Sequence, residues 1–389
     1  MSETHLEPAL SESSGFSFGE VPSLTTPTTA APAAPSLGPL AAFTGAFTGN
    51  GFNLIFRPDS AKTPTPLPKP VTGSDNVLEL NLTLETLSFS RSLGSVPNRG
   101  SNAQGDIFLN GVPYLQTISD VTNPGQPVGI HFEPGLWMAV PPTTHPAEGP
   151  TVVRMASIPH GTTVEAQGTS SSAAGKPTIP TVDITPFSTG HPHNKIPFPS
   201  QKATSNDTAR IPQDLTSFIA AGTITQAMLT DPNTVLRNHI APQTITSTTT
   251  ISISSQPAIP LFGGGTDNIA FLLGNAAASG AAPNAQTLKM EATFWIETVE
   301  YTIEVPVFQP GQPALIISGN PDAPGQPVPE FLVNPPAAIT APRSITVTAT
   351  QIQYSQRVFL NFNTLTWPHV SVATLVPVGP IPVPASAFA

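Results

Sequence analysis

The sequence approaches its C-terminal end through Leu365-Thr366-Trp367-Pro368-His369-Val370-Ser371-Val372-Ala373-Thr374-Leu375-Val376, whose β-branched residues predict a strand. Successive side chains of a strand point to opposite faces, so His369, Ser371 and Ala373 share one face. A close-packed core would place bulky residues there, so these small ones favour an open wall. We therefore expect an imidazole that faces a ligand. The alternative is a strand-end histidine bonded to a backbone carbonyl.

The same two-residue alternation recurs along the chain and predicts an all-β protein. The 389 residues include 48 prolines and 29 glycines, which interrupt the chain too often for long helices. Apolar segments between turn residues predict strands at 40–56, 76–90, 106–120, 129–140, 151–158, 161–168, 244–254, 268–273, 288–305, 344–362 and 368–377. About ten strands suit an up-and-down antiparallel β-barrel that encloses a ligand and leaves no open edge.

The segments between the strands set the expected domain organisation. Residues 1–36 are rich in Ser, Thr, Pro and Ala and predict a flexible tail. One barrel is expected over 37–377, since no internal repeat is found. Within it, 169–240 is expected to be an inserted loop with short helical turns at 213–222 and 225–229, and 306–343 a long loop. Residues 378–389 predict a Pro-rich tail.

Charge and composition exclude several classes of function. The net charge is −10 and there is no basic run, so nucleic acid is not an expected partner. The absence of cysteine excludes disulfides, thiolate nucleophiles and Cys-based metal sites. The first 20 residues are acidic and unlike a secretory signal, and no apolar run is long enough to span a membrane. We therefore expect a cytoplasmic protein.

Three motifs resemble those of a known family. His131-x-Glu133-x-Gly135, followed by Val153, Ala156, Gly161 and Gly168 at fixed spacing, resembles the central hairpin of the nitrobindin-like haem proteins of the calycin superfamily. Gly45-x-Phe47-x-Gly49-x-Gly51 looks like their first-strand glycine motif, with Phe47 where tryptophan is usual. Pro368-His369-Val370-x-x-Ala373-x-Leu375 is similar to the segment with their proximal haem histidine.

The resemblance implies a calycin-like barrel that binds haem b through His369, beside Ser371 and Ala373. It implies NO, peroxide or peroxynitrite chemistry, with peroxynitrite isomerisation or a peroxidase-like reaction as the activity. On the glycine-rich first strand, the candidates for the opposite wall are Thr44, Thr48 and Asn50; alternatively, the glycines only bend the strand. Arg99 is a candidate for a ligand carboxylate or propionate, or a solvated turn residue.

His131 and Glu133 are the candidate catalytic pair. They are two residues apart on one strand face, which is close enough for a proton relay. The alternative is a structural pair at the barrel rim, with Arg154 crossing to Glu133.

Three functions remain open from the sequence. The first is a haem barrel, the second a carrier or sensor of a non-haem hydrophobic molecule such as a lipid or pigment, and the third a structural or assembly protein. Apolar residues on both faces of several strands predict that the N-terminal tail, residues 169–240 or another subunit covers the barrel, and we expect a homo-oligomer.

Overall fold

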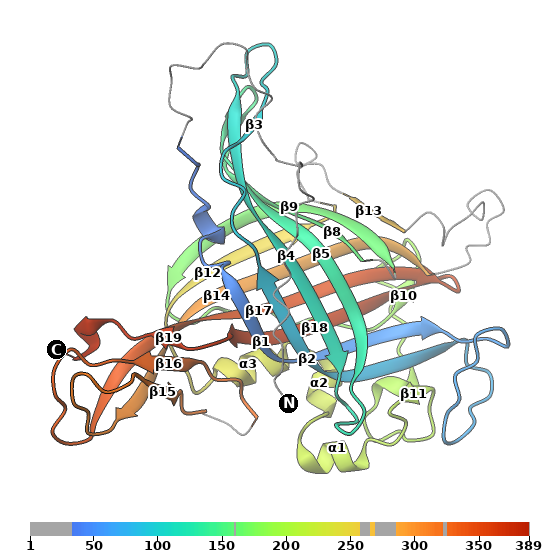
Figure 1. The fold of residues 1–389 in the computed structure, drawn as a ribbon. Helices are drawn as coiled ribbons and strands as arrows, with labels where there is room; N and C mark the ends of the chain where they lie inside the picture. The colour runs from blue at the N-terminus through green and yellow to red at the C-terminus, as the bar shows by residue number, and fades with distance from the viewer. Residues whose placement is uncertain (1–32, 159–160, 257–264, 269–284, 322–324, 389) are drawn as a thin grey trace, which may run out of the picture. The chain divides into compact units, whose positions relative to one another are not determined.

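Ten antiparallel strands form a closed barrel (Figure 1). The structure is a computed structural model and describes residues 33–158, 161–256, 265–268, 285–321 and 325–388. The barrel strands are β1 (Gly45–Pro58), β2 (Asn76–Phe89), β4 (Ile107–Asp120), β5 (Val128–Val140), β8 (Thr151–Ser157), β9 (Thr162–Ala174), β12 (Thr244–Ser254), β14 (Gln286–Val305), β17 (Arg343–Phe362) and β18 (Leu365–Pro377). Each pairs with the next, and β18 closes on β1. The predicted up-and-down barrel is confirmed.

Short strands extend this sheet. They are β3 (Val96–Asn98) on β4, β10 (Phe187–Ser188) on β18, β11 (Arg210–Ile211) on β2, and β13 (Gly265–Asn268) on β9. β6 (Thr143–Thr144) pairs with β7 (Ala147–Glu148). The strand expected at 268–273 lies outside the described residues except for residue 268, and the expected tail is described only from residue 33.

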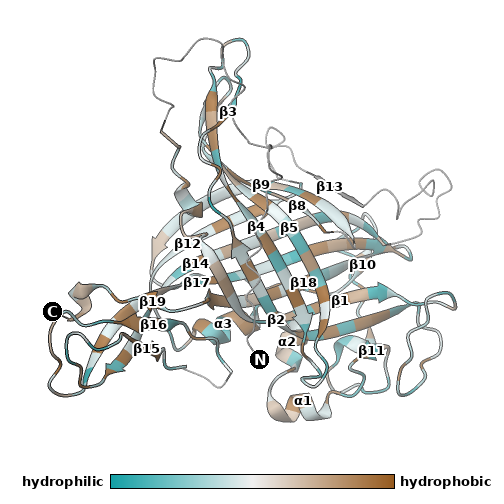
Figure 2. Ribbon diagram, viewed as in Figure 1, coloured by the Kyte–Doolittle hydropathy of each residue, from teal (hydrophilic) through white to brown (hydrophobic). Residues whose placement is uncertain are grey.

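Alternation along the strands decides what enters the barrel, and Figure 2 shows hydrophobic and hydrophilic residues alternating along them. At one end, five rings fill the interior as an aromatic core: Phe43, Phe47, Phe89, Trp137 and Phe294. Phe43 stacks on Phe89 with ring centroids 4.6 Å apart. Trp137 meets Phe294 edge to face at 5.1 Å. This end of the barrel is therefore closed by its own side chains.

The inserted segment covers part of the outer wall. It contains α1 (Thr216–Ala221), α2 (Gln226–Thr230) and α3 (Thr234–Ile240). Val370 and Val372, on the outer face of β18, belong to one buried cluster with Leu236 of α3 and Leu229 of α2. The apolar outer face predicted from the sequence is thus buried by residues 169–240, apart from 169–174, which continue β9.

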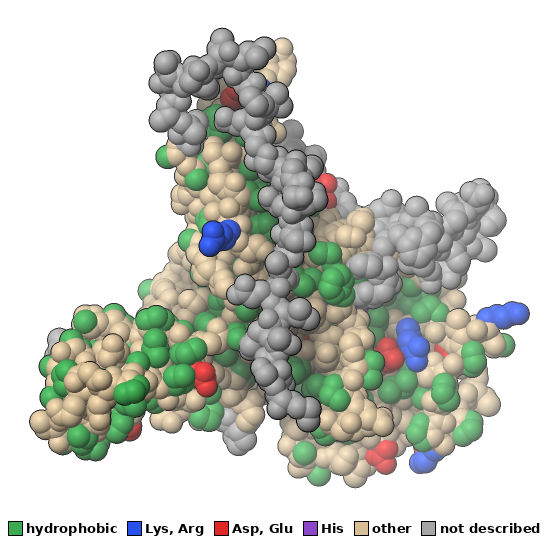
Figure 3. Space-filling view, in the orientation of Figure 1, with side chains coloured by type: hydrophobic (Ala, Val, Ile, Leu, Met, Phe, Trp, Pro, Cys, Tyr) green, Lys and Arg blue, Asp and Glu red, His purple; other side chains and the backbone are tan. Residues whose placement is uncertain are grey.

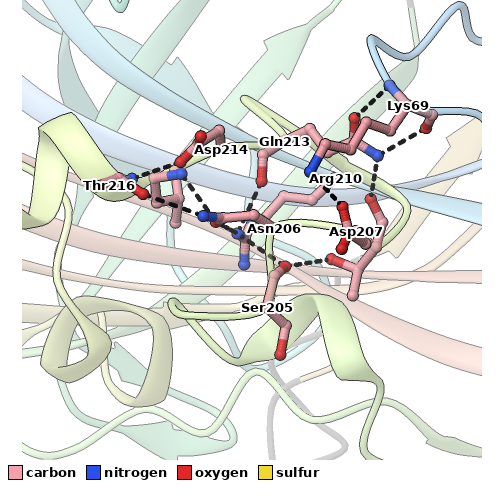
Figure 4. A network of polar contacts seen from close by, with 10 residues as sticks. Lys69, Ser205, Asn206, Asp207, Arg210, Gln213, Asp214 and Thr216 are labelled. Carbon is pink, nitrogen blue, oxygen red and sulfur yellow. Dashed lines mark hydrogen bonds and ion pairs between the residues drawn. The ribbon is translucent and has the colours of Figure 1, made fainter.

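Arg210 holds the insertion together from inside (Figure 4). Its side chain is fully buried and donates to the carbonyl oxygens of Ser200, Lys202 and Gln213 at 2.9, 2.7 and 3.0 Å. Burial lowers its pKa to about 10. Through Gln213, which bonds the Lys69 backbone at 2.8 and 2.9 Å, the loop is tied to the β1–β2 connection.

Residues 306–343 and the C-terminal segment form a second, small sheet. It contains β15 (Leu315–Ser318), β16 (Glu330–Val333) and β19 (Ile381–Pro382), with β19 parallel to β16. The other helical elements of the described residues are 3-10 turns at Gly38–Leu40, Pro199–Gln201 and Ala385–Phe388. In the described part of the chain, the longest α-helix has seven residues, and none could cross a membrane.

Candidate functional site

The end of the barrel opposite the aromatic core contains a cavity of about 490 Å³. On β1 the aromatic core includes Phe47 whereas the cavity is lined by Asn53 and Ile55, and on β18 Leu375 packs in the core whereas His369 lines the cavity. The aromatic core and the cavity therefore occupy successive positions along the barrel axis. Seven large aliphatic residues line the cavity beside polar ones: Ile55, Ile118, Val128, Ile130, Ile158, Val358 and Leu360.

Amides fix the imidazole of His369 in the cavity wall. Asn53 Nδ2 lies 2.8 Å from His369 Nε2 and 2.8 Å from Ser371 Oγ. Asn53 faces Ser371 across β1 and β18 and Asn81 across β1 and β2, and Asn81 donates to Asn53 Oδ1 at 3.4 Å. Because an amide nitrogen only donates, the His369 Nε2 lone pair accepts this bond. The structure places His369 and Ser371 at the cavity, as the strand parity predicts.

A polar layer separates the cavity from the aromatic core. Its members are Glu85, Tyr114, Gln116, Glu133, Arg154, Tyr354 and Gln356. Arg154 pairs with Glu133, donates to Tyr114 OH at 2.8 Å and donates to Gln356 Oε1 at 2.7 Å. Tyr114 also donates to Glu133.

The predicted pair His131 and Glu133 is in contact, with Nε2 3.0 Å from Oε2. His131 lines the cavity, whereas Glu133 is 1% exposed and lies in the polar layer. Burial alone would raise the pKa of Glu133, but the charge of Arg154 and the bond from His131 outweigh it and lower the pKa to about 2. Glu133 is thus a fixed carboxylate that orients the His131 ring. The Arg154 crossing expected from the sequence is present.

Glu85 is the second carboxyl group of the polar layer. It accepts from Tyr354 OH at 2.6 Å, from Thr83 Oγ1 at 2.9 Å and from Gln116 Nε2 at 3.3 Å. Burial raises its pKa to about 6, although these hydrogen bonds act in the opposite direction. Gln116 and Tyr354 also line the cavity, so they lie between Glu85 and any molecule bound there.

Thr44, Thr48 and Asn50 do not line the cavity. Thr44 and Asn50 are exposed, and Thr48 bonds the Glu85 backbone. The reason is parity, because inward positions on β1 are the odd-numbered ones. Nor do the glycines admit a ligand: a Cβ on Gly51 would lie 2.4 Å from the Val372 carbonyl oxygen and 2.8 Å from Glu85 Oε1. The glycines let β18 and the polar layer approach β1.

Two further candidates also lie elsewhere. Arg99 pairs with Asp106 at 2.9 Å on the surface, where its side chain is 89% exposed. Ala373 is buried opposite Tyr354 in register and packs with the aromatic core. The residues that sequence reasoning missed are Asn53, Asn81, Glu85, Gln116 and Tyr354. Asn81, Thr83 and Glu85 alternate along β2, a signal that its inward face is polar.

Two carboxyl groups line the cavity, and one of them, Glu79, pairs with Arg57 at 3.3 Å. The described lining of the cavity contains Glu79 and Asp120 and no lysine or arginine. The pKa of Glu79 is raised, mainly by burial. The charge of Asp120 acts in the same direction and the charge of Arg57 in the opposite one. On the face drawn in Figure 3, the Lys and Arg side chains of the described residues are few and scattered. Over the described residues, no group of three or more His, Cys, Asp or Glu could hold a metal ion.

Comparisons with known proteins give little guidance. No protein-family model and no curated protein matches this sequence. Among solved structures, the crystal structure of Rv2717c from M. tuberculosis is similar over 89% of this chain and 99% of that chain, with 10% identity and a TM-score of 0.34. So weak a likeness carries no argument about function. The barrel assignment follows from the strand pairing, and the nitrobindin-like resemblance from sequence motifs alone.

Proposed function

We propose that the protein binds one small, largely apolar molecule in the open end of the barrel. The cavity carries this proposal: about 490 Å³ falls in the range of roughly 300–1,000 Å³ usual for ligand sites. The aliphatic part of the wall favours an apolar body, and the imidazoles, amides and hydroxyls offer polar contacts that orient it. The aromatic core limits how deep the ligand reaches.

Haem is a second candidate, favoured by the imidazole of His369 at an aliphatic wall. Haem would supply an iron centre for the NO or peroxide chemistry that the sequence motifs imply. The residues fit it only in part. The Nε2 atom of His369 already accepts a bond from Asn53, and the lining offers Glu79 and Asp120 where propionates need cations. A smaller uncharged molecule fits the cavity better.

The purified protein tests both candidates. Native mass spectrometry and organic extraction would detect a co-purified ligand, and the visible spectrum, with and without added haem, would detect a Soret band. A bound organic molecule without a Soret band supports the first proposal. A Soret band that His369→Ala abolishes and Thr302→Ala, an exposed change on β14, retains would replace it with haem. An empty barrel that binds neither haem nor apolar probes would refute both.

A further inference from the structure

Glu85 is a buried carboxyl group held mainly by hydrogen bonds. Its side chain is 1% exposed, and within the described ranges no lysine or arginine forms an ion pair with it. The interior arginine, Arg154, is committed to Glu133. A buried carboxylate of this kind is stabilised mainly by hydrogen-bond donors, so it attracts any further donor that reaches it.

The Tyr354 hydroxyl lies between Glu85 and the cavity, because it bonds Glu85 and Tyr354 lines the cavity. Its proton is donated to Glu85 Oε2 at 2.6 Å, so towards a ligand the phenol can act only as an acceptor. The phenolic oxygen has two lone pairs. Gln116 Nε2 uses one at 3.1 Å, and among the described residues no other donor lies within hydrogen-bonding distance of this oxygen.

We propose that the ligand carries a hydroxyl group, as phenols and alcohols do, and donates it to the Tyr354 oxygen, with Glu85 as the final acceptor. This inference rests on the proposed function and narrows its ligand class. An anion is disfavoured, because Glu79 and Asp120 also line the cavity. A bond to Tyr354 is strongest when Glu85 is ionised, since the carboxylate polarises the phenol.

Several groups surround Glu85 and bear on its titration. β1 contributes Gly51, β4 contributes Gln116, and β17 contributes Tyr354. The charges nearby are His131 on β5, which acts on Glu85, and Arg154 on β8, which acts on Tyr354. A His131→Gln variant removes this imidazole, so a pH effect that remains in it belongs to Glu85.

Three probes that share a naphthalene body test the proposal: naphthol, its methyl ether, and naphthoate. Their affinities for the full-length protein are measured by fluorescence at neutral pH. We expect naphthol to bind roughly ten-fold more tightly than the ether, and naphthoate to bind most weakly. Tyr354→Phe and Glu85→Gln should each reduce the naphthol preference to within about two-fold. Glu297→Gln, which changes a buried carboxyl outside the cavity, should retain it.

Acid provides an independent readout. In wild type and in His131→Gln, the naphthol preference should fall as the pH drops from about 7.5 to about 5, because Glu85 becomes protonated. Equal affinity for naphthol and ether in wild type would overturn this proposal but leave the proposed function standing. So would a preference that persists in Tyr354→Phe, which would show that the ether is merely too large. Failure of all three probes to bind would overturn the proposed function as well. Thermal melting establishes whether each variant is folded. If Glu85→Gln does not fold, the naphthol preference of Tyr354→Phe decides the test.

Discussion

Arg154→Met should be the most costly single change inside the barrel. Arg154 is 2% exposed and pairs with Glu133, whose pKa is lowered to about 2 from an ordinary 4.5. That difference corresponds to roughly 3 kcal/mol of stability at neutral pH. Methionine keeps the length but leaves a buried carboxylate without its cation, and breaking such a pair costs about 3–5 kcal/mol. We expect a loss of this size at neutral pH.

Urea unfolding followed by tryptophan fluorescence measures this loss, since Arg154 lies 5.7 Å from the Trp137 ring. The folded pKa of Glu133 is depressed, so its contribution is present above about pH 4.5 and disappears as the pH falls towards about 2. Wild type should therefore approach the variant in acid. Arg99→Met removes an exposed pair and should cost under about 1 kcal/mol. A loss below about 1 kcal/mol for Arg154→Met, or a difference that does not change with pH, would refute the reasoning.

Three further predictions concern stability. Burial raises the pKa of Glu297 to about 8. Ionisation of this group should therefore lower the stability of the wild type by up to about 5 kcal/mol as the pH rises from about 5 to about 9. Urea titrations should show that Glu297→Gln abolishes this loss. In Arg210→Lys, the lysine side chain cannot bond all the carbonyl oxygens that the guanidinium bonds. The change should lower stability by more than about 2 kcal/mol and expose residues 199–216 to limited proteolysis. Unchanged cleavage would contradict this. Gly51→Ala should cost at least about 1–3 kcal/mol in melting experiments, and Gly129→Ala, where a Cβ meets open space, should cost far less.

The sequence predicts the barrel well because strand alternation and turn residues are local signals. The positions of His369 and Ser371 at the cavity follow from the same parity. The assignment of Thr44, Thr48 and Asn50 to the inner wall ignored that parity: Gly49 and Gly51 occupy the inward positions on β1, so the residues between them face outwards.

The polar layer could not be assembled from the sequence. Glu85 and Tyr354 are 269 positions apart and meet inside the barrel, where β1 and β18 are the two strands between β2 and β17. The same holds for β19, whose two residues pair with β16 across a long stretch of chain. Such contacts join residues far apart in the sequence, and no local pattern specifies them.

The most direct test of the account is to fill the cavity. Phenylnaphthylamine, an uncharged fluorescent probe, is titrated into wild type, Ser371→Phe and Thr302→Phe, which place the same ring inside the cavity wall or on the exposed face of β14. We expect one bound probe per chain, an affinity at least about ten-fold weaker in Ser371→Phe, and no change in Thr302→Phe. Equal binding by wild type and a folded Ser371→Phe would show that the cavity is not the ligand site.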